Sequence, residues 1–254
     1  GQNFYRTKGR RDRVTAIAIT GGWPLRAWSS LFQRALYQAR KLERFAAQSG
    51  GKLMLVLTAA DLDALQARRE QHEPVVGGFA GLEGVHALGG RLENIDRLFQ
   101  AVFRMIGLAH FFDNRAAGSA HGAKKGGLTP FGREVVRKVQ DTHMLLDLSH
   151  ASQQAIDDVL EMATAPVMVS HTGVCGVHDH PRNLSDAHIR RIAASGGVVG
   201  IALFEGALPA PSLPLAARSM RYVADLAGVD AVALGSDFDG GVTAPVAARG
   251  LPLL

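Results

Sequence analysis

Cysteine is nearly absent from this sequence, since Cys175 is the single one among 254 residues. These residues therefore cannot form a disulfide with one another, and a zinc module built from several cysteines is excluded. No apolar run reaches the roughly 18 residues that a membrane-spanning helix needs, so we expect no transmembrane segment. Aromatic residues make up only 6% and are not interleaved with basic ones, so the net charge of +5 does not indicate nucleic-acid binding.

The rest of the composition is typical of a folded protein, with 47% hydrophobic and 20% charged residues. Basic residues are concentrated near the start, at Arg6, Lys8, Arg10, Arg11 and Arg13. Such a segment can contact nucleic acid or anionic lipid, but we interpret it as a solvated terminus. The apolar stretch at 14–20 is too short for a secretory signal and has no clear cleavage pattern. We expect a cytoplasmic protein, with export as the alternative.

Short apolar runs alternate with amphipathic helical patterns along the chain. The runs predict strands at 52–58, 75–82, 104–109, 144–148, 166–170, 197–204 and 231–235. The patterns predict helices at 31–47, 61–69, 92–102, 153–163, 186–195 and 215–227, and a further helix that begins at Thr129-Pro130. This alternation predicts a parallel sheet, either open and doubly wound or closed as a (β/α)8 barrel.

Polar residues follow many of the successive predicted strands rather than one pair of them. Glu83, His110, His150, His171 and Asp237 each come just after such a strand. This distribution favours an α/β protein with a (β/α)8 TIM-type barrel, because an open sheet would gather its polar residues at one switch point. In a barrel the five side chains would converge on one mouth.

Each of these five residues has an ordinary alternative. A histidine after a strand is often a hydrogen-bonding loop residue, Asp237 could cap a helix, and Glu83 could be solvated in its glycine-rich turn. Their shared position makes those alternatives weaker when the five are considered together. Two imidazoles and one carboxylate are a sufficient protein set for zinc with an open position for water. Paired metals bridged by a carboxylate would activate water for hydrolysis.

Several other sequence patterns do not indicate a functional site. The run DFDG at 237–240 begins like a calcium loop but has none of the later acidic ligands. Ser149-His150 and Ser170-His171 are adjacent pairs, and neighbouring strand-end side chains are expected to point apart, so we predict no Ser–His nucleophile. We expect the remaining histidines to be surface or supporting residues, with His86 and His180 closest to the site.

At these residues the sequence resembles the membrane dipeptidase (renal dipeptidase) family of zinc-dependent barrel hydrolases. The matching segments are GLEGVH at 81–86, GLAH at 107–110, GLTPFGREVV at 127–136, LDLSH at 146–150, APVMVSH at 165–171, PRN at 181–183 and GSDFDG at 235–240. The loop with FFDNR at 111–115 and GSAHG at 118–122 looks like the bacterial members. The resemblance runs from about Leu31 to the end of the sequence, in matching order and spacing.

The resemblance implies a role for each matched residue. Glu83 matches the carboxylate that bridges two zinc ions, and His150 and His171 match the histidine ligands of one of them. His110 matches a histidine that contacts the substrate and helps stabilise the tetrahedral intermediate. Arg182 matches the arginine that holds the substrate carboxylate, and Asp237 matches the acid–base aspartate. The implied reaction is hydrolysis of a dipeptide by a metal-bound hydroxide.

The sequence departs from the family at its start, because no histidine precedes His72 and the His-x-Asp pair of the first barrel strand is missing. We therefore expect a barrel incomplete at both ends, with a divergent basic segment at 1–30 and a partial dipeptidase-like domain at 31–254. One zinc is expected where the family has two. The alternatives are an impaired member that only binds a ligand, and another metal-dependent amidohydrolase. Relatives are often dimers, so a homodimer is also expected.

Overall fold

The computed structural model describes residues 18–238, 242, 244–245 and 251. Its centre is a six-stranded parallel sheet in which each strand pairs with its neighbours in sequence order, β3-β4-β5-β6-β7-β8. These strands are β3 (Ala80–Glu83), β4 (Phe103–Gly107), β5 (Leu145–Asp147), β6 (Val167–Thr172), β7 (Val198–Ile201) and β8 (Val232–Leu234). The basic segment at residues 6–13 lies outside the described residues.

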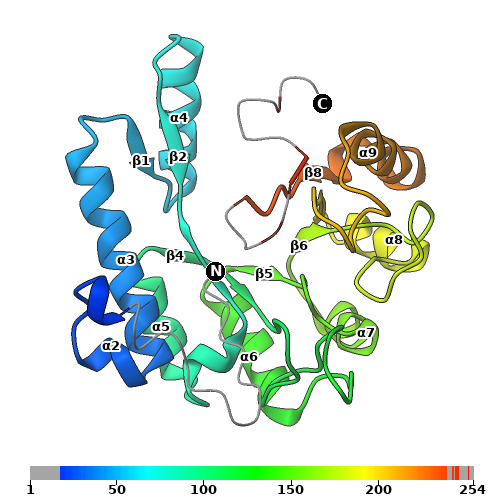
Figure 1. Ribbon diagram of the computed structural model, residues 1–254, viewed down its shortest axis with the longest axis horizontal. Helices are drawn as coiled ribbons and strands as arrows, with labels where there is room; N and C mark the ends of the chain where they lie inside the picture. Colours follow the sequence, from blue (N-terminus) through cyan, green and yellow to red (C-terminus); the bar gives the residue numbers. More distant parts are fainter. Residues whose placement is uncertain (1–17, 239–241, 243, 246–250, 252–254) are drawn as a thin grey trace.

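A helix connects each strand of this sheet to the next. They are α5 (Glu93–Phe99), α6 (Pro130–Asp141), α7 (Gln153–Met162), α8 (Asp186–Ala194) and α9 (Leu213–Ala227). Figure 1 shows them following one another around the outside of a curved sheet. Consecutive parallel strands with helices outside are the arrangement of a (β/α)8 barrel, so the predicted fold class is confirmed. Among the described residues β3 and β8 do not pair with each other, so this part of the barrel is open.

The expected helix starts are set by side-chain caps. Thr129 accepts a hydrogen bond from the backbone N–H of Gly132 at the start of α6, and Ser152 caps α7 in the same way. Ser185 caps α8. These hydroxyls satisfy backbone N–H groups that have no partner within the helix, which explains why the helices begin where the sequence predicts.

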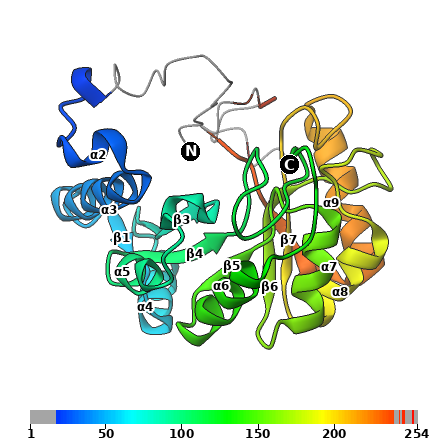
Figure 2. The same ribbon diagram turned by 90° about the horizontal axis from the view of Figure 1, so that it is seen from below.

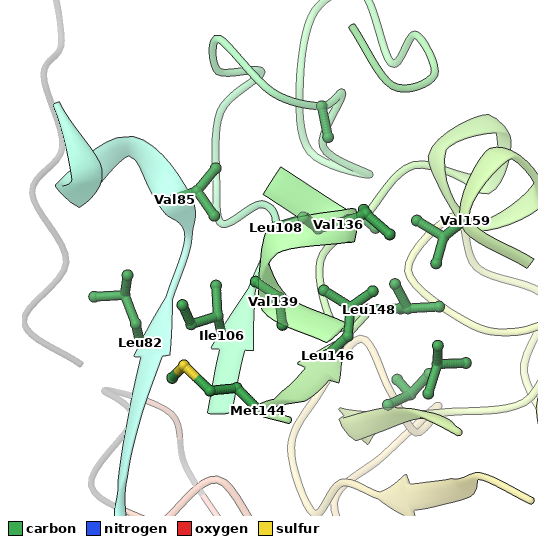
Figure 3. Close-up of a cluster of buried hydrophobic side chains, with 14 of the residues drawn as sticks. Leu82, Val85, Ile106, Leu108, Val136, Val139, Met144, Leu146, Leu148 and Val159 are labelled. Carbon is green, nitrogen blue, oxygen red and sulfur yellow. The ribbon is translucent and has the colours of Figure 1, made fainter. Parts of the chain in front are cut away.

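The core lies between the sheet and its helices. Figure 3 shows Leu82, Ile106 and Leu146, one from each of three neighbouring strands, together with Val136 and Val139 of α6. Ile106 is fully buried and Leu146 is 1% exposed. In β7 the consecutive residues 199–201 are all buried, so both faces of this strand are covered, as its continuous apolar sequence predicts.

The N-terminal part of the described chain forms a second, smaller layer. It contains α2 (Arg26–Ser29), α3 (Leu31–Gln48), β1 (Leu53–Leu55), α4 (Ala59–Glu70) and β2 (Val76–Gly78). Strands β1 and β2 pair in parallel as a separate two-stranded sheet. The sequence predicted one strand over 75–82, but that segment divides after Gly78, and its two halves join different sheets. Gly77 packs so closely against Leu65 of α4 that a Cβ atom would lie 2.2 Å from it.

The connections that follow β4, β6 and β7 extend beyond the same edge of the large sheet, as Figure 2 shows from the side. This edge is the carboxyl end of the strands, where parallel α/β proteins place their chemistry. No helix in the described part of the chain has the length and apolar character needed to cross a membrane.

Candidate metal centre and active site

The structure gathers the predicted residues at the carboxyl edge of the large sheet. Glu83 is the last residue of β3, while His110 and His150 each come three residues after the end of a strand, β4 and β5. Asp237 stands in the same position after β8. His171 lies inside β6 rather than after it, because that strand continues to Thr172. Parallel strands end together, so these side chains meet.

Three of these side chains form a compact group, which we call the ligand cluster: Glu83, His150 and His171. Oε1 of Glu83 lies 3.0 Å from Nε2 of His150 and 3.4 Å from Nε2 of His171. The two Nε2 atoms are 2.8 Å apart. The facing atoms of all three residues lie within 4.8 Å of one another, which is the spacing that a shared metal ion requires.

The electrostatics of the ligand cluster favour a negative carboxylate on Glu83 and a neutral ring on His150. Burial alone would raise the pKa of Glu83, but the close imidazoles of His150, His171 and His110 outweigh it and lower the pKa well below its usual range. Burial lowers the pKa of His150 to about 2, and the nearby positive charge of Arg182 acts in the same direction. An ionised carboxylate and neutral imidazoles are the forms that bind metal ions.

Two further predicted residues face the same cavity, which measures about 1410 Å³ and is lined by Glu83, His110, His171 and Asp237 among others. Nε2 of His110 lies 3.4 Å from the second oxygen of Glu83, and its ring packs against that of His150 with 4.7 Å between the ring centroids. Burial lowers the pKa of His110 to about 4, so its ring is neutral near pH 7. Burial raises the pKa of Asp237 above its ordinary value.

Arg182 occupies a different place from the other predicted residues. It is 5% exposed and lies behind His171, where its Nη2 donates a hydrogen bond to the backbone carbonyl of His171 at 2.7 Å. It is not among the residues that line the cavity. No carboxylate of the described residues comes within 4.0 Å of its guanidinium, and its Nε is buried without a partner among them. Burial lowers its pKa to about 10, which still leaves it charged at neutral pH.

The backbone is constrained at two of the site residues. His150 has φ 62° and Asp237 has φ 56°, which places both in the left-handed region that residues other than glycine rarely adopt. Such conformations cost free energy and tend to occur where a side chain must point in a particular direction. Gly84, directly after Glu83, has φ 89°, and a Cβ there would lie 2.6 Å from the His86 ring. Glycine at position 84 therefore leaves room for the His86 ring beside the turn that follows Glu83.

Sequence reasoning identified one neighbour of the site and missed another. His86, expected to be close to the site, lines the cavity, whereas no signal singled out His121, whose ring packs 5.3 Å from that of His150. The expectation that adjacent serine and histidine side chains point apart is wrong for Ser170 and His171, since Ser170 Oγ lies 2.9 Å from His171 Nδ1. A bulge in β6 between Val169 and Thr172 breaks the regular alternation of side chains.

The donor set of the ligand cluster fits a metal ion, and zinc in particular. Two imidazole nitrogens and a carboxylate oxygen leave the open coordination position that catalytic zinc sites keep. Two of the three side chains, His150 and His171, are buried, which limits competition by water. The cluster is also the sole group of three or more such residues found close together in the described part of the chain.

The comparisons with known proteins agree with this geometry. The family model of the membrane dipeptidases, peptidase family M19, matches residues 6–251. An uncharacterized protein encoded in the pqqA 5' region of Klebsiella pneumoniae is 32% identical over 217 residues, which cover 80% of this chain and 78% of that protein. An uncharacterized dipeptidase of Schizosaccharomyces pombe is 32% identical over 167 residues, covering 63% of this chain and 41% of the relative.

Two solved structures share the fold and part of the sequence. An amidohydrolase from Pseudomonas aeruginosa has a TM-score of 0.74 and 25% identity, and the match covers 85% of this chain and 65% of that one. A metallo peptidase from Rhodobacter sphaeroides, liganded with a phosphinate mimic of the dipeptide L-Ala-D-Ala, has a TM-score of 0.73 and 27% identity over 85% and 64%. This chain therefore spans just under two thirds of those structures and less than half of the yeast dipeptidase.

The family match extends over nearly the whole chain, and the relatives include both dipeptidases and metallopeptidases. The clustered glutamate and histidines supply the candidate metal-binding group that a metallopeptidase needs. On this evidence the chain belongs to the membrane dipeptidase family, peptidase family M19, whose members are metal-dependent hydrolases of dipeptides.

Proposed function

We propose that this chain hydrolyses dipeptides with the help of one zinc ion held by the ligand cluster. The observation that carries the proposal is the convergence of Glu83, His150 and His171 within 4.8 Å at the carboxyl edge of the sheet, in a chain of the M19 family. Zinc bound there would act as a Lewis acid that lowers the pKa of water and polarises the peptide carbonyl.

Asp237 is the proposed acid–base residue. Its raised pKa moves its proton exchange toward neutral pH, where general acid–base catalysis is most effective. The carboxylate takes a proton from the attacking water as the new C–O bond forms. It then delivers that proton to the amino group that leaves as the C–N bond breaks. The neutral ring of His110 can donate a hydrogen bond to the oxygen that becomes negative during attack.

The proposed substrate carries a free carboxylate. The relative from Rhodobacter sphaeroides is liganded with a phosphinate mimic of the dipeptide L-Ala-D-Ala, and a dipeptide has a free carboxylate. Arg182 supports the same substrate class, because its buried guanidinium meets no carboxylate among the described residues. The carboxylate of a substrate within reach of this guanidinium would neutralise its positive charge. Contact with the substrate requires the guanidinium to become accessible beside His171.

The direct experiment measures dipeptide hydrolysis by the purified chain, first after removal of metal by a chelator and then after stepwise addition of zinc. The panel contains L-Ala-L-Ala, L-Ala-D-Ala and the same peptides with amidated carboxyl ends. We expect turnover that follows zinc up to about one ion per chain, and a preference for the free carboxylate. The variant Glu83→Gln keeps the shape of the side chain but removes its charge. It should lose on the order of 10³-fold in turnover, since a metal ion contributes several kcal/mol to the transition state.

Glu93→Gln is the matched control, because Glu93 lies on the exposed surface of α5 and contacts Arg91. It should keep full activity. Binding of a dipeptide without any turnover at saturating zinc would support the ligand-binding alternative instead. Preferential hydrolysis of lactams or esters would support another metal-dependent amidohydrolase. The homodimer, the cytoplasmic location and the division at residue 30 stay predictions.

A further inference from the structure

A buried carboxylate outside the ligand cluster organises the serines next to it. Asp147, the last residue of β5, is 2% exposed. Its Oδ1 accepts hydrogen bonds from the backbone N–H groups of Ser149, at 3.0 Å, and Ser170, at 2.8 Å. Its Oδ2 accepts the hydroxyl of Ser170 at 2.6 Å. We call Asp147, Ser149 and Ser170 the support network.

The direction of each hydrogen bond in the support network can be assigned. Ser170 Oγ donates its single hydroxyl hydrogen to Oδ2 of Asp147, so that hydrogen is committed to this bond. Ser170 Oγ can then act only as an acceptor toward its other two neighbours. These are Ser149 Oγ, 3.0 Å away, and His171 Nδ1, 2.9 Å away. The backbone N–H of His171 donates to Ser149 Oγ at 3.0 Å, which satisfies that hydroxyl as well.

This assignment fixes the position of the proton on the His171 ring. Because Ser170 Oγ can only accept, Nδ1 of His171 must carry the hydrogen. A ring whose one hydrogen is on Nδ1 has a lone pair on Nε2, the atom that faces Glu83. This lone pair accepts the 2.8 Å hydrogen bond from Nε2 of His150. The other histidine of the cluster has no such support, since His150 Nδ1 is buried without a hydrogen-bond partner among the described residues.

The geometry points to the support network as a set of positioning residues that hold His171 as its Nδ1–H tautomer, with a bare Nε2 ready to bind metal. The inference rests on the proposed metal site and adds the means by which one of its ligands is oriented. Partners of this kind behind a ligating histidine fix its orientation, and their loss typically lowers metal affinity about 10- to 100-fold.

The variant Asp147→Asn tests the assignment, because it reverses the chain of hydrogen bonds without changing its shape. The amide oxygen can still accept the two backbone N–H groups, but the amide nitrogen now donates to Ser170 Oγ. Ser170 is then free to donate to Nδ1 of His171, which moves the ring proton to Nε2 and blocks metal binding. A carboxylate-to-amide change can reverse the tautomer of a catalytic histidine in this way.

The primary readout is the nitrogen NMR spectrum of the metal-free chain, labelled at histidine and recorded at mildly alkaline pH. The His171 signals are assigned by their loss in His171→Asn. We expect the Nδ1–H form in the natural chain and the Nε2–H form in Asp147→Asn. Zinc affinity, measured by competition with a coloured chelator, should fall about 10- to 100-fold in Asp147→Asn. Ser170→Ala should show mixed tautomers and a smaller loss.

Asp157→Asn is the matched control, since Asp157 also contacts a histidine, His188, with 3.0 Å between Oδ1 and Nε2, but belongs to helix α7. It should change neither the His171 spectrum nor zinc affinity. An Nε2–H form in the natural chain, or unchanged tautomer and affinity in Asp147→Asn, would overturn the inference. Should Asp147→Asn fail to fold, Ser170→Ala decides by the same two measurements. Failure of the natural chain to bind zinc would overturn the metal site itself, and the NMR spectrum would show whether the tautomer assignment survives.

Discussion

Two carboxylates near the ends of strands in the two different sheets have opposite surroundings: Asp61 comes after β1, and Glu83 is the last residue of β3. Asp61 accepts hydrogen bonds from the backbone N–H groups of Leu57 and Thr58, at 2.9 and 2.8 Å, and completes a capping box at the start of α4. Glu83 contacts three imidazoles at the end of β3. The sequence places an acid near the end of each strand, but the donors around it decide whether it caps a helix or binds a metal.

Burial differs between the same two regions. The largest fully buried side chains all come from the region of the six-stranded sheet, between Leu88 and Leu203. In the two-stranded sheet the side chains of β1 are half-buried, and Val76 of β2 is 65% exposed. A metal site needs ligands held in fixed positions, and close packing provides that rigidity. The candidate site therefore lies in the better-packed of the two regions.

The largest expected effect of a single substitution on stability comes from that packing. Ile106→Ala removes a fully buried side chain of β4 and should lower the free energy of unfolding by about 2–5 kcal/mol. Val76→Ala, its counterpart in the two-stranded sheet, should change it by less than about 0.5 kcal/mol. Urea unfolding of both variants measures the difference. Equal losses of unfolding free energy in the two variants would show that the two sheets contribute equally to stability, which would contradict the comparison.

Replacing one histidine in each region should change zinc affinity only in the region of the six-stranded sheet. His150 and His72 both have a left-handed backbone, with φ of 62° and 61°, and asparagine tolerates that conformation. His150→Asn removes one ligand and should weaken zinc binding by about 100-fold or more, which exceeds the usual effect of losing a supporting residue. His72→Asn should leave zinc affinity unchanged. Competition with a coloured chelator measures both, and similar affinities for the two variants would contradict the assignment.

The smallest predicted effect is a pH dependence that comes from the site. In the unfolded chain His110 gains a proton below its ordinary pKa of 6.5, but in the folded chain not until about 4. The unfolded state therefore binds more protons between these values, so the folded metal-free chain loses stability as pH falls from 6.5 toward 4. One such histidine contributes at most about 1.4 kcal/mol per pH unit. Glu83, with a lowered pKa, adds to this loss only below its ordinary value of 4.5.

Urea unfolding of the metal-free chain between pH 4.5 and 6.5 measures the contribution of the histidines to the pH dependence of stability. Glu83 contributes only below this range. The slope of stability against pH should be smaller in His110→Gln than in the natural chain. Four other histidines have pKa values that burial also lowers and should contribute to the slope that remains: His86, His121, His150 and His180. A variant with the full slope would show that His110 does not stay neutral in the folded state.

The sequence predicted the order of strands and helices because each strand is a continuous apolar run and several helices begin at a capping hydroxyl. It also predicted that five residues after parallel strands converge at one edge. Four of them line one cavity, and the fifth, His150, lies in the ligand cluster beside it. It did not predict the division of the segment 75–82 between two sheets, because pairing depends on contacts far away in the chain. The close packing of Gly77 against Leu65 of α4 is one such contact.

The role of Asp147 could not be predicted for a different reason. The motif LDLSH at 146–150 contains it, but a single acid inside a strand end has no pattern that distinguishes a support from a ligand. Its function depends on the bulge in β6, which turns the Ser170 hydroxyl toward the ring of its own neighbour. Regular alternation would have placed Ser170 and His171 on opposite faces. Local irregularities of this kind are visible only in the folded chain.

The most direct test of the central claim is a crystal structure of the chain grown with zinc, with anomalous scattering recorded on both sides of the zinc absorption edge. The account predicts a zinc peak bound by the facing atoms of Glu83, His150 and His171, at bond lengths of about 2.0–2.2 Å. A peak held by other residues, or none at these three under zinc saturation, would contradict it.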